Sequence, residues 1–236
     1  GLIQNGTTYL LSMNIKGSAN DKFTGGFRSS DYKAVGDLHS PIKVTTEWQT
    51  IEVPITCTGD GTVRILFDLG RYAGDIWFDN IKLDILGRAN AISTADFSSM
   101  NNYNWWNQQP NDETTSVELS EGALVITNTD TSGDQWAIQL EIARGFNIQA
   151  GGNYIVRITM KASADGSAQI VLGGFNIGDM YNTLDFSQSN EYKTYEVGYF
   201  NSSISDSSNN IHVLWQGRKY NGTATIGKVE VIEYIQ

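Results

Sequence analysis

The chain has 236 residues, 18% charged and 40% apolar, a balance typical of a folded protein of one or two domains. A net charge of −10 argues against nucleic acid and anionic lipid as partners. A single cysteine excludes an internal disulfide, two histidines add no clustered zinc ligands, and no apolar run approaches the roughly 18 residues of a membrane span.

Short segments of alternating apolar and polar residues follow one another along the chain, separated by Gly, Asn, Asp or Ser. They are TYLLSMNIK (8–16), WQTIEVPI (48–55), TVRILFDLG (62–70), YIVRITMK (154–161), YKTYEVGYF (192–200) and TIGKVEVIEYI (225–235). Alternation of this kind is typical of half-buried antiparallel strands, and no segment shows a convincing helical period. The pattern predicts an all-β protein, a β-sandwich with jelly-roll wiring.

The chain contains an internal repeat. IQNGTTYLLSMNIKGSA (3–19) matches IQAGGNYIVRITMKASA (148–164), and GGFRSSDY (25–32) then matches GGFNIGDMY (173–181). The order continues with EWQTIEV (47–53) on EYKTYEV (191–197), and with residues 69–86 on residues 216–235. The sequence therefore predicts two tandem copies of one module.

The two copies differ at their beginnings. Residues 87–146, with the segments GALVITN and WAIQLEI, precede the repeat in the second copy and have no counterpart in the first. We predict that residues 1–86 are the C-terminal part of a first module without its N-terminal strands, and that residues 87–236 are a complete second module. A sandwich without those strands exposes an apolar face and an unpaired edge, so we expect the rest of the first module to lie outside this sequence.

Three elements together resemble a known family. WAIQLEI is followed by G-x-x-Y and an alternating strand ending in Lys-Ala-Ser, and the closing strand reads IWFDNIKLDIL (76–86) in the first copy. This pattern resembles the jelly-roll carbohydrate-binding modules of families 4, 9 and 22 over essentially the whole chain, and the tandem pair is similar to modules in xylanases of gut and rumen Bacteroidetes. The resemblance implies non-catalytic binding of plant cell-wall polysaccharide, xylan first and β-glucan second. It also implies a covalently linked glycoside hydrolase, an endo-xylanase, outside the cell or on the bacterial cell surface.

A sugar ring has C–H groups on a flat face and hydroxyls around its edge, so its site needs aromatic platforms beside amides, carboxylates or guanidinium groups. The resembling modules place in the cleft an aromatic residue at the start of the WAIQLEI strand and a polar residue three positions later. These are Trp136 and Gln139 here. The alternative is a Trp136 buried at the end of the core.

Two further aromatic residues follow a pair of glycines. Phe175 comes directly after Gly-Gly, as Phe27 does in the first copy, and Tyr181 lies just beyond. Glycines at a strand end permit a bulge or the close approach of another chain, so we expect Phe175 and Tyr181 at the rim of the cleft. The alternative is an ordinary hairpin with a half-buried Phe175.

The segment LWQG (214–217) does not settle which face of its strand is buried. Aligned with FDLG (67–70), it makes Trp215 an outward platform, which we favour, and turns His212 and Gln216 inward. An inward Gln needs a partner, and the reverse face puts His212 and Gln216 in the cleft and Trp215 in the core. Arg218 either reaches sugar hydroxyls or bridges a surface carboxylate.

The stretch NNYNWWNQQPND (102–113) sets Trp105 and Trp106 among amides. Neighbouring side chains of an extended segment point in opposite directions, so we predict Trp106 as a second rim platform. The alternative is that both rings pack under the loop.

Asp79 is a candidate ligand of a structural calcium ion. Asp79 resembles the closing-strand acid that helps to hold a structural calcium in these modules, whereas the second copy has Gly227 and Lys228 there. A structural calcium could therefore bind only in the intact protein, and no cofactor is required for binding.

Two other classes of function were weighed. A jelly-roll hydrolase needs paired carboxylates, yet the sequence has neither a Glu-x-Asp-x-x-Glu strand nor a Gly-x-Ser-x-Gly elbow. An adhesin-type sandwich that binds protein would show a flat apolar patch instead of a grooved surface of aromatic and amide groups. The sequence favours a binding module over both.

Overall fold

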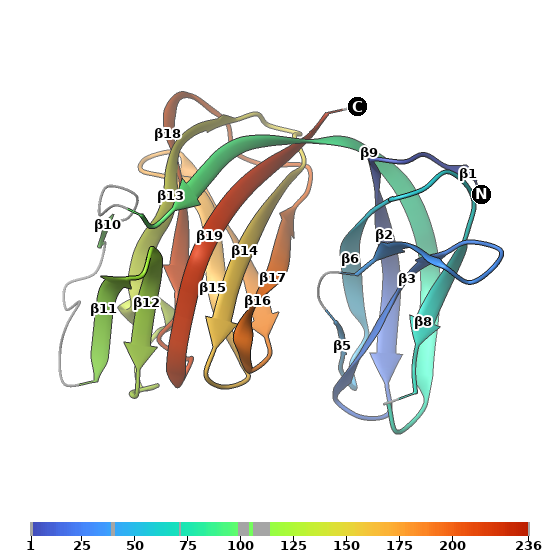
Figure 1. Ribbon diagram of the computed structural model, residues 1–236, viewed down its shortest axis with the longest axis horizontal. Helices are drawn as coiled ribbons and strands as arrows, with labels where there is room; N and C mark the ends of the chain where they lie inside the picture. Colours follow the sequence, from blue (N-terminus) through green and yellow to red (C-terminus); the bar gives the residue numbers. More distant parts are fainter. Residues whose placement is uncertain (1, 39–40, 71, 99–103, 106–113, 236) are drawn as a thin grey trace. The chain divides into compact units, whose positions relative to one another are not determined.

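The computed structural model describes residues 2–38, 41–70, 72–98, 104–105 and 114–235. They form two compact units: unit 1 is Gly1–Asn90 with Tyr234–Gln236, and unit 2 is Ala91–Glu233. Apart from a single 3-10 turn, η2 (Gln135–Ala137), the regular structure in these residues is all strand (Figure 1). The predicted all-β class is confirmed. None of the helical segments in the described ranges is long and apolar enough to cross a bilayer.

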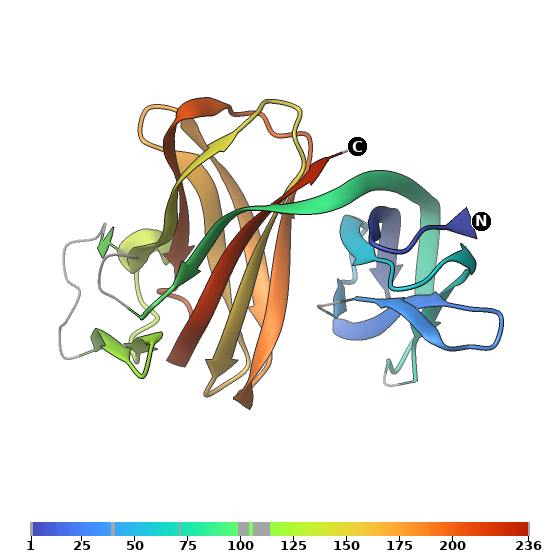
Figure 2. The same ribbon diagram turned by 45° about the horizontal axis from the view of Figure 1, so that its top comes forward.

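Unit 2 is built from two antiparallel sheets. Sheet A contains, in order, β11 (Thr115–Ser120), β12 (Ala123–Asn128), β19 (Gly222–Ile235), β14 (Tyr154–Ala162) and β17 (Ser189–Tyr199). Sheet B contains β10 (Asn104–Trp105), β13 (Gln139–Ile148), β18 (Asp206–Gln216), β15 (Gly166–Gly174) and β16 (Gly178–Phe186). Figure 2 shows β19, β14 and β17 side by side in one layer.

The connections of unit 2 have jelly-roll order. From β12 to β19, each strand is followed by one in the other sheet, except for the β15–β16 hairpin within sheet B. This gives the orders β12-β19-β14-β17 and β13-β18-β15-β16, in which strands distant in sequence are neighbours. The predicted jelly-roll sandwich is therefore confirmed.

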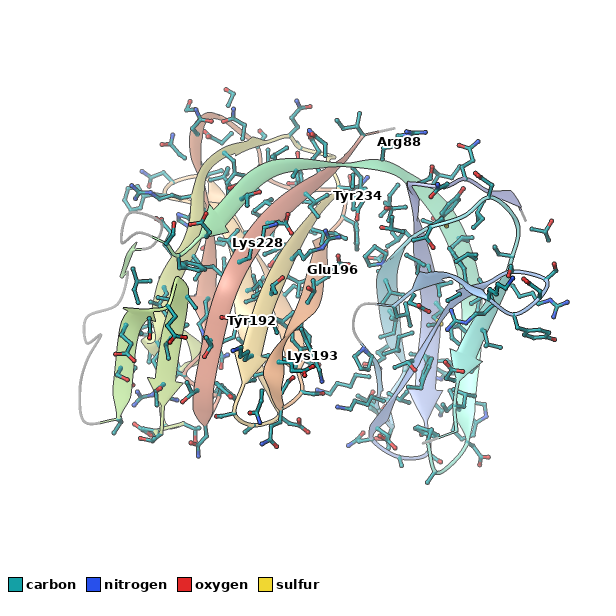
Figure 3. The ribbon with its side chains drawn as sticks, viewed as in Figure 1. Arg88, Tyr192, Lys193, Glu196, Lys228 and Tyr234 are labelled. Atoms are coloured by element: carbon teal, nitrogen blue, oxygen red, sulfur yellow. The ribbon has the colours of Figure 1, made fainter. Side chains whose placement is uncertain are left out.

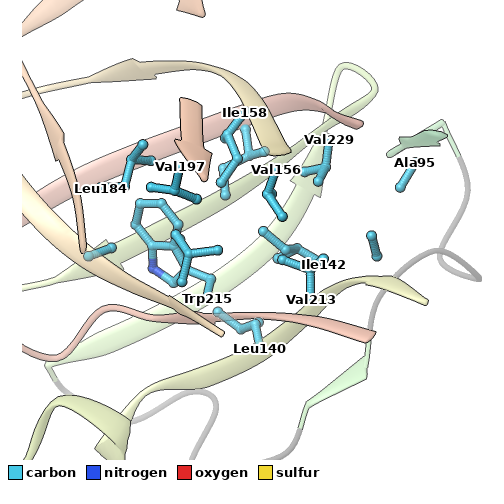
Figure 4. Close-up of a cluster of buried hydrophobic side chains, with 14 of the residues drawn as sticks. Ala95, Leu140, Ile142, Val156, Ile158, Leu184, Val197, Val213, Trp215 and Val229 are labelled. Atoms are coloured by element: carbon cyan, nitrogen blue, oxygen red, sulfur yellow. The ribbon is translucent and has the colours of Figure 1, made fainter. Parts of the chain in front are cut away.

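The core of unit 2 lies between the two sheets. Alternate side chains of β14, such as Val156 and Ile158, point inward from sheet A and are fully buried. From sheet B, Leu140, Ile142 and Val213 meet this layer (Figure 4). Burying an aliphatic side chain of this size contributes about 1.5–3 kcal/mol, so this layer is the main source of stability.

Unit 1 repeats part of this wiring. One sheet has the order β9 (Ile76–Asp96), β2 (Thr7–Gly17), β6 (Gln49–Thr56). In the other, β3 (Asp21–Arg28) pairs with β4 (Ala34–Asp37), β8 (Arg64–Asp68) and β5 (Ile42–Val44), while β1 (Leu2–Ile3) pairs with β7 (Gly61–Thr62). The orders β9-β2-β6 and β8-β3-β4 match β19-β14-β17 and β18-β15-β16. Within the described residues, unit 1 has no strand equivalent to β12, and at the place of β13 it has only the two-residue β1, whose Ile3 matches Ile148 at the end of β13.

The repeat extends to the register of the strands. Leu11 on β2 faces Leu83 on β9, as Val156 on β14 faces Val231 on β19. In both pairs a register shift then interrupts the ladder, and in β9 Asn80 adopts a left-handed backbone conformation with φ 53° at this place. The two units are therefore copies in backbone detail as well as in sequence.

The inward face of β9 is only partly covered in unit 1. Ile81 is 52% exposed and Leu83 38%, whereas Val229 and Val231, at the matching places of β19, are both 0% exposed. Unit 1 nevertheless has its own core, in which Leu11, a neighbour of Leu83, is fully buried. The module limits 1–86 and 87–236 stay a prediction, while the compact units divide the chain between residues 90 and 91.

Candidate binding cleft

The outward face of sheet B carries a row of three glutamines. Gln139 on β13 faces Gln216 on β18, which faces Gln169 on β15. The Gln216 side-chain amide donates a hydrogen bond to Gln139 Oε1, and Gln135 Nε2 donates to the Gln216 carbonyl oxygen at 2.7 Å. The row therefore presents amide donors and acceptors, of which those of Gln139 and Gln216 are held in place by each other.

A second polar row crosses the same face. Arg144 on β13 faces His212 on β18, which faces Gly173 on β15, and Gly173 in turn faces Asp179 on β16. A Cβ atom at Gly173 would lie 2.0 Å from Asp179 Oδ1, so only glycine leaves room for this carboxylate. Asp179 Oδ2 accepts a hydrogen bond from the Tyr181 hydroxyl at 3.0 Å, and this contact raises the pKa of Tyr181.

Three exposed aromatic side chains stand around these rows. Trp136 projects from the 3-10 turn that precedes β13, Phe175 from the turn between β15 and β16, and Tyr181 from β16. Together they border a cleft of about 520 Å³, whose lining also includes Gln139, Gln169, Asn176, Asp179, His212, Leu214 and Gln216. Volumes of this size suit a small-molecule or oligosaccharide ligand.

The cleft adjoins a second hollow through Phe175 and His212. This hollow, of about 570 Å³, is also lined by Glu141 and Arg144. Glu141 is buried, with Oε2 3.5 Å from His212 Nδ1, and its Oε1 accepts a hydrogen bond from Arg144 Nη1 at 3.3 Å. Burial lowers the pKa of His212, and the opposing effects of Glu141 and Asp179 are smaller. His212 is therefore neutral at pH 7.

The structure brings four of the predicted site residues together. Trp136, Gln139, Phe175 and Tyr181 all line the cleft, although the sequence places them on three separate segments. Trp136 is 58% exposed, which removes the alternative of a tryptophan buried in the core. Their role in binding a ligand stays a prediction.

The favoured alignment predicted an outward Trp215, and this prediction is wrong. Trp215 is 1% exposed and stacks on Phe186 in the core, with ring centroids 5.8 Å apart, so it cannot serve as a platform (Figure 4). The reverse face of β18 is the one observed, because His212 and Gln216 line the cleft. Outward glutamine amides are paired there, whereas an inward Gln216 would lose its partners.

The match between Phe27 and Phe175 does not hold in space. Gly25 faces Phe67, as Ile170 faces Trp215, so Phe27 takes the place that Leu172 has in unit 2. Phe27 is accordingly in the core of unit 1, whereas Phe175 is exposed in a turn.

Arg218 does not line the cleft. Arg218 Nε donates to the Ser132 carbonyl oxygen at 2.9 Å, and its guanidinium pairs with Asp130, so it holds a loop beside sheet A. Trp106 lies outside the described residues. Asp79 Oδ1 accepts a hydrogen bond from the Asn80 amide at 2.8 Å, and no group of three or more metal-ligating side chains occurs in the described part of the chain.

Sequence reasoning missed three polar side chains of the cleft, Gln169, Asn176 and Asp179. Gln169 lies between the buried residues Ala168 and Ile170, and this alternation was a usable signal for an outward Gln. Asp179 has no such signal, because its position depends on the hairpin register that sets it against Gly173.

No protein-family model matches this sequence, and no curated protein matches it. Among solved structures, the chain is similar to the apo form of CBM1 of BiXyn10A, with 25% identity and a TM-score of 0.49 over 60% of this chain and 97% of that one. It is also similar to the second N-terminal cellulose-binding domain of Cellulomonas fimi β-1,4-glucanase C, with 16% identity and a TM-score of 0.47 over 62% and 95%. The CBM22-1–CBM22-2 tandem of Paenibacillus barcinonensis Xyn10C gives 10% identity and 0.39 over 98% and 79%. The solved structures that this chain resembles are thus carbohydrate-binding modules.

Proposed function

We propose that unit 2 binds a polysaccharide in the cleft on sheet B and does not cleave it. The observation that carries this proposal is the arrangement of Trp136, Phe175 and Tyr181 around a row of glutamine amides, two of which are hydrogen-bonded to each other. Exposed rings stack on the C–H faces of sugars, while fixed amides exchange hydrogen bonds with hydroxyls. Rings and amides in one cleft match the two surfaces that a sugar presents.

The charges of the cleft favour a neutral ligand. Asp179 contributes a carboxylate to the lining, the charge of Glu141 is met by Arg144, and His212 is neutral at pH 7. An acidic glycan would be repelled by Asp179 without meeting a cation of its own. Within the plant cell-wall polysaccharides, we propose xylan first and β-glucan second, on the family resemblance of the sequence motifs.

The same resemblance supports a wider role. We propose that the chain is part of a larger glycoside hydrolase, an endo-1,4-β-xylanase, located outside the cell or on the bacterial cell surface. The module would then hold the linked catalytic domain against its substrate.

Calorimetric titration with xylohexaose and cellohexaose tests the site. Truncating a central aromatic anchor costs about 2 kcal/mol or more, so Trp136→Ala should weaken binding by about thirtyfold. Tyr192→Ala is the matched control, because Tyr192 is also an exposed ring but lies on β17 of sheet A, and it should leave the affinity unchanged. A Trp136→Ala protein that keeps the parent circular dichroism spectrum and binds like the parent would overturn the assignment of the cleft.

The non-catalytic part of the proposal has its own test. The chain should release no reducing ends from xylan or mixed-linkage glucan during prolonged incubation. Release that disappears in a Glu141→Gln or Asp179→Asn variant would show instead that the jelly roll is a hydrolase.

A further inference from the structure

Unit 1 carries two exposed tryptophans on the outward face of its β9-β2-β6 sheet. Lys16 on β2 faces Trp77 on β9, and Ile15 faces Gln49, so Trp48 comes next to Lys16 on the other side. Lys16 Nζ lies 5.7 Å from the centroid of the Trp48 ring and 5.2 Å from that of Trp77. We call these three residues the Trp-Lys-Trp row.

The row is accessible and its rings are widely spaced. Trp48 is 52% exposed and Trp77 44%, and the two residues lie two strands apart. Neighbouring strands are about 4.8 Å apart, so the two tryptophans start about 10 Å from one another on a shallow, open surface. Such a spacing leaves room for separate sugar rings over the two indoles.

Polar side chains lie directly beside the row. On the next outward position of β2, Asn14 faces Thr50 on β6 and Asp79 on β9. Thr50 Oγ1 donates a hydrogen bond to Asn14 Oδ1 at 3.0 Å, and Asp79 is engaged with the Asn80 amide groups. Hydroxyl and amide groups are therefore available next to the rings.

In the described part of the chain, the Lys16 ammonium lies against two aromatic rings. Among the residues that the structure describes, no carboxylate forms an ion pair with Lys16, and its two cation-π contacts are each worth about 0.5–1 kcal/mol at an exposed site. An ammonium held between two rings, without an acidic partner, is a ready binding group for an incoming carboxylate.

Unit 2 provides an internal comparison. The matching Lys161 lies 4.5 Å from the centroid of one ring, Tyr192, and faces Thr225 where unit 1 has Trp77. The basic groups around it are paired with acids: Arg157 with Glu196 at 2.7 Å and Lys228 with Glu230 at 2.8 Å. Tyr192, Glu196 and Lys228 come from β17 and β19 (Figure 3). The sheet of unit 2 is thus stable with one aromatic ring beside its lysine. Packing alone therefore does not explain why unit 1 has a second, exposed indole at the matching place.

We infer that the Trp-Lys-Trp row is a second carbohydrate-binding site, specific for polysaccharides that carry carboxylate groups, such as uronic-acid residues. The two indoles stack on sugar rings, and the Lys16 ammonium pairs with the carboxylate of a sugar between them. This inference does not depend on the cleft of unit 2, whose described lining includes no lysine or arginine, whereas Lys16 lies between the two indoles of unit 1 and the neighbouring Asp79 carboxylate accepts hydrogen bonds from Asn80. The two units then divide acidic and neutral glycans between them.

The test uses the full chain, with hexagalacturonate and xylohexaose as acidic and neutral probes in calorimetric titrations at low salt. Trp77→Thr, which introduces the residue of unit 2, should weaken hexagalacturonate binding at least tenfold and leave xylohexaose binding unchanged. Lys16→Met, which keeps the apolar stem, should remove both the preference for the acidic probe and its sensitivity to salt. Tyr192→Ala should change neither titration.

The opposite results are equally clear. Hexagalacturonate that fails to bind the folded parent, or binds Trp77→Thr as tightly as the parent, overturns the inference. Stronger binding of a glutamate hexapeptide than of hexagalacturonate would overturn it in favour of an acidic peptide partner. Trp136→Ala separates the two proposals, because it should weaken only xylohexaose binding, by about thirtyfold, so either site can fail without the other.

Discussion

In unit 2 the strands β12 and β13 extend the two sheets, whereas the described part of unit 1 has no equivalent of β12 and only the two-residue β1 at the place of the end of β13. The shared strands keep the same order and the same register in both units. The buried side chains differ, because Val229 and Val231 of unit 2 are covered and Ile81 and Leu83 of unit 1 are partly exposed. The repeated part of the sequence is thus sufficient for the strand order of the sandwich but not for complete burial of its core.

The cleft also depends on segments that unit 2 has and the described part of unit 1 lacks. Gln139 comes from β13 itself and Trp136 from the turn that leads into it, so unit 1 has no equivalent of either among the described residues. On the matching face, unit 1 has Tyr32, exposed to solvent with Arg64 over its ring at 4.8 Å. The additional N-terminal strands therefore supply both the cover of the core and half of the binding site.

The largest expected effect concerns separate fragments. Residues 87–236 should fold alone and melt cooperatively, because both sheets of unit 2 lie within them. Residues 1–86 should remain largely unfolded, because the partly exposed β9 face removes a share of the hydrophobic stabilisation that a domain of this size needs. Circular dichroism melting checks both fragments, and a sharp transition for residues 1–86 would contradict the comparison.

A smaller effect is expected from single core residues at matching places. Trp215→Ala should destabilise unit 2 by about 3–5 kcal/mol, the usual cost of emptying a large aromatic site. Phe67→Ala, at the place in unit 1 that matches Trp215, should cost less, because Phe67 is only partly buried. Urea unfolding measures both changes in the free energy of unfolding. Equal losses would mean that the cores are equally closed.

A pH dependence is expected in unit 2 from His212. Burial holds its pKa below the ordinary value in the folded protein, so the unfolded chain takes up the proton first as the pH falls. The stability present above the ordinary pKa, about 6.5, is therefore lost as the pH falls through the lowered value. The loss in the free energy of unfolding between pH 7.5 and pH 5 should be smaller in His212→Gln than in the parent. An identical loss in the variant would exclude His212 as its source.

The smallest expected effect is a labelling rate in unit 1. Cys57 is buried, and burial raises the pKa of its thiol to about 11, so little thiolate is present at pH 8. Alkylation by iodoacetamide should be slow in the native protein and should accelerate at urea concentrations that leave the fluorescence of unit 2 unchanged. Rapid labelling without urea would show that unit 1 is open under native conditions.

The sequence was sufficient for the fold because its signals are local or repeated. Alternation in YIVRITMK marked Val156 and Ile158 as inward, and the internal repeat located the equivalent strands of both units. The position of Trp136 at a strand start, beside Gln139, was also readable. These signals need no knowledge of which strands are neighbours.

The rest of the site depends on pairing between distant strands. Alternation divides β18 into two faces but does not say which is buried, and Trp215 was therefore assigned to the wrong face. A three-residue offset between the sequence match and the strand pairing likewise separates Phe27 from Phe175, because Phe27 takes the place of Leu172 despite the identical Gly-Gly-Phe letters. Asp179 approaches Gly173 only through a hairpin register that the sequence does not state.

The jelly-roll order has a consequence for the synthesis of this protein. Leu124 on β12 pairs with Ile226 on β19, so an early strand emerges from the ribosome long before its neighbour exists. Pairings between distant strands form slowly, because the intervening chain loses conformational entropy before the contacts that stabilise the pairing are made. Until β19 is made, the apolar side chains of β12 and β14 remain open to association with other chains. The risk of aggregation during translation therefore lasts until β19 has been synthesised.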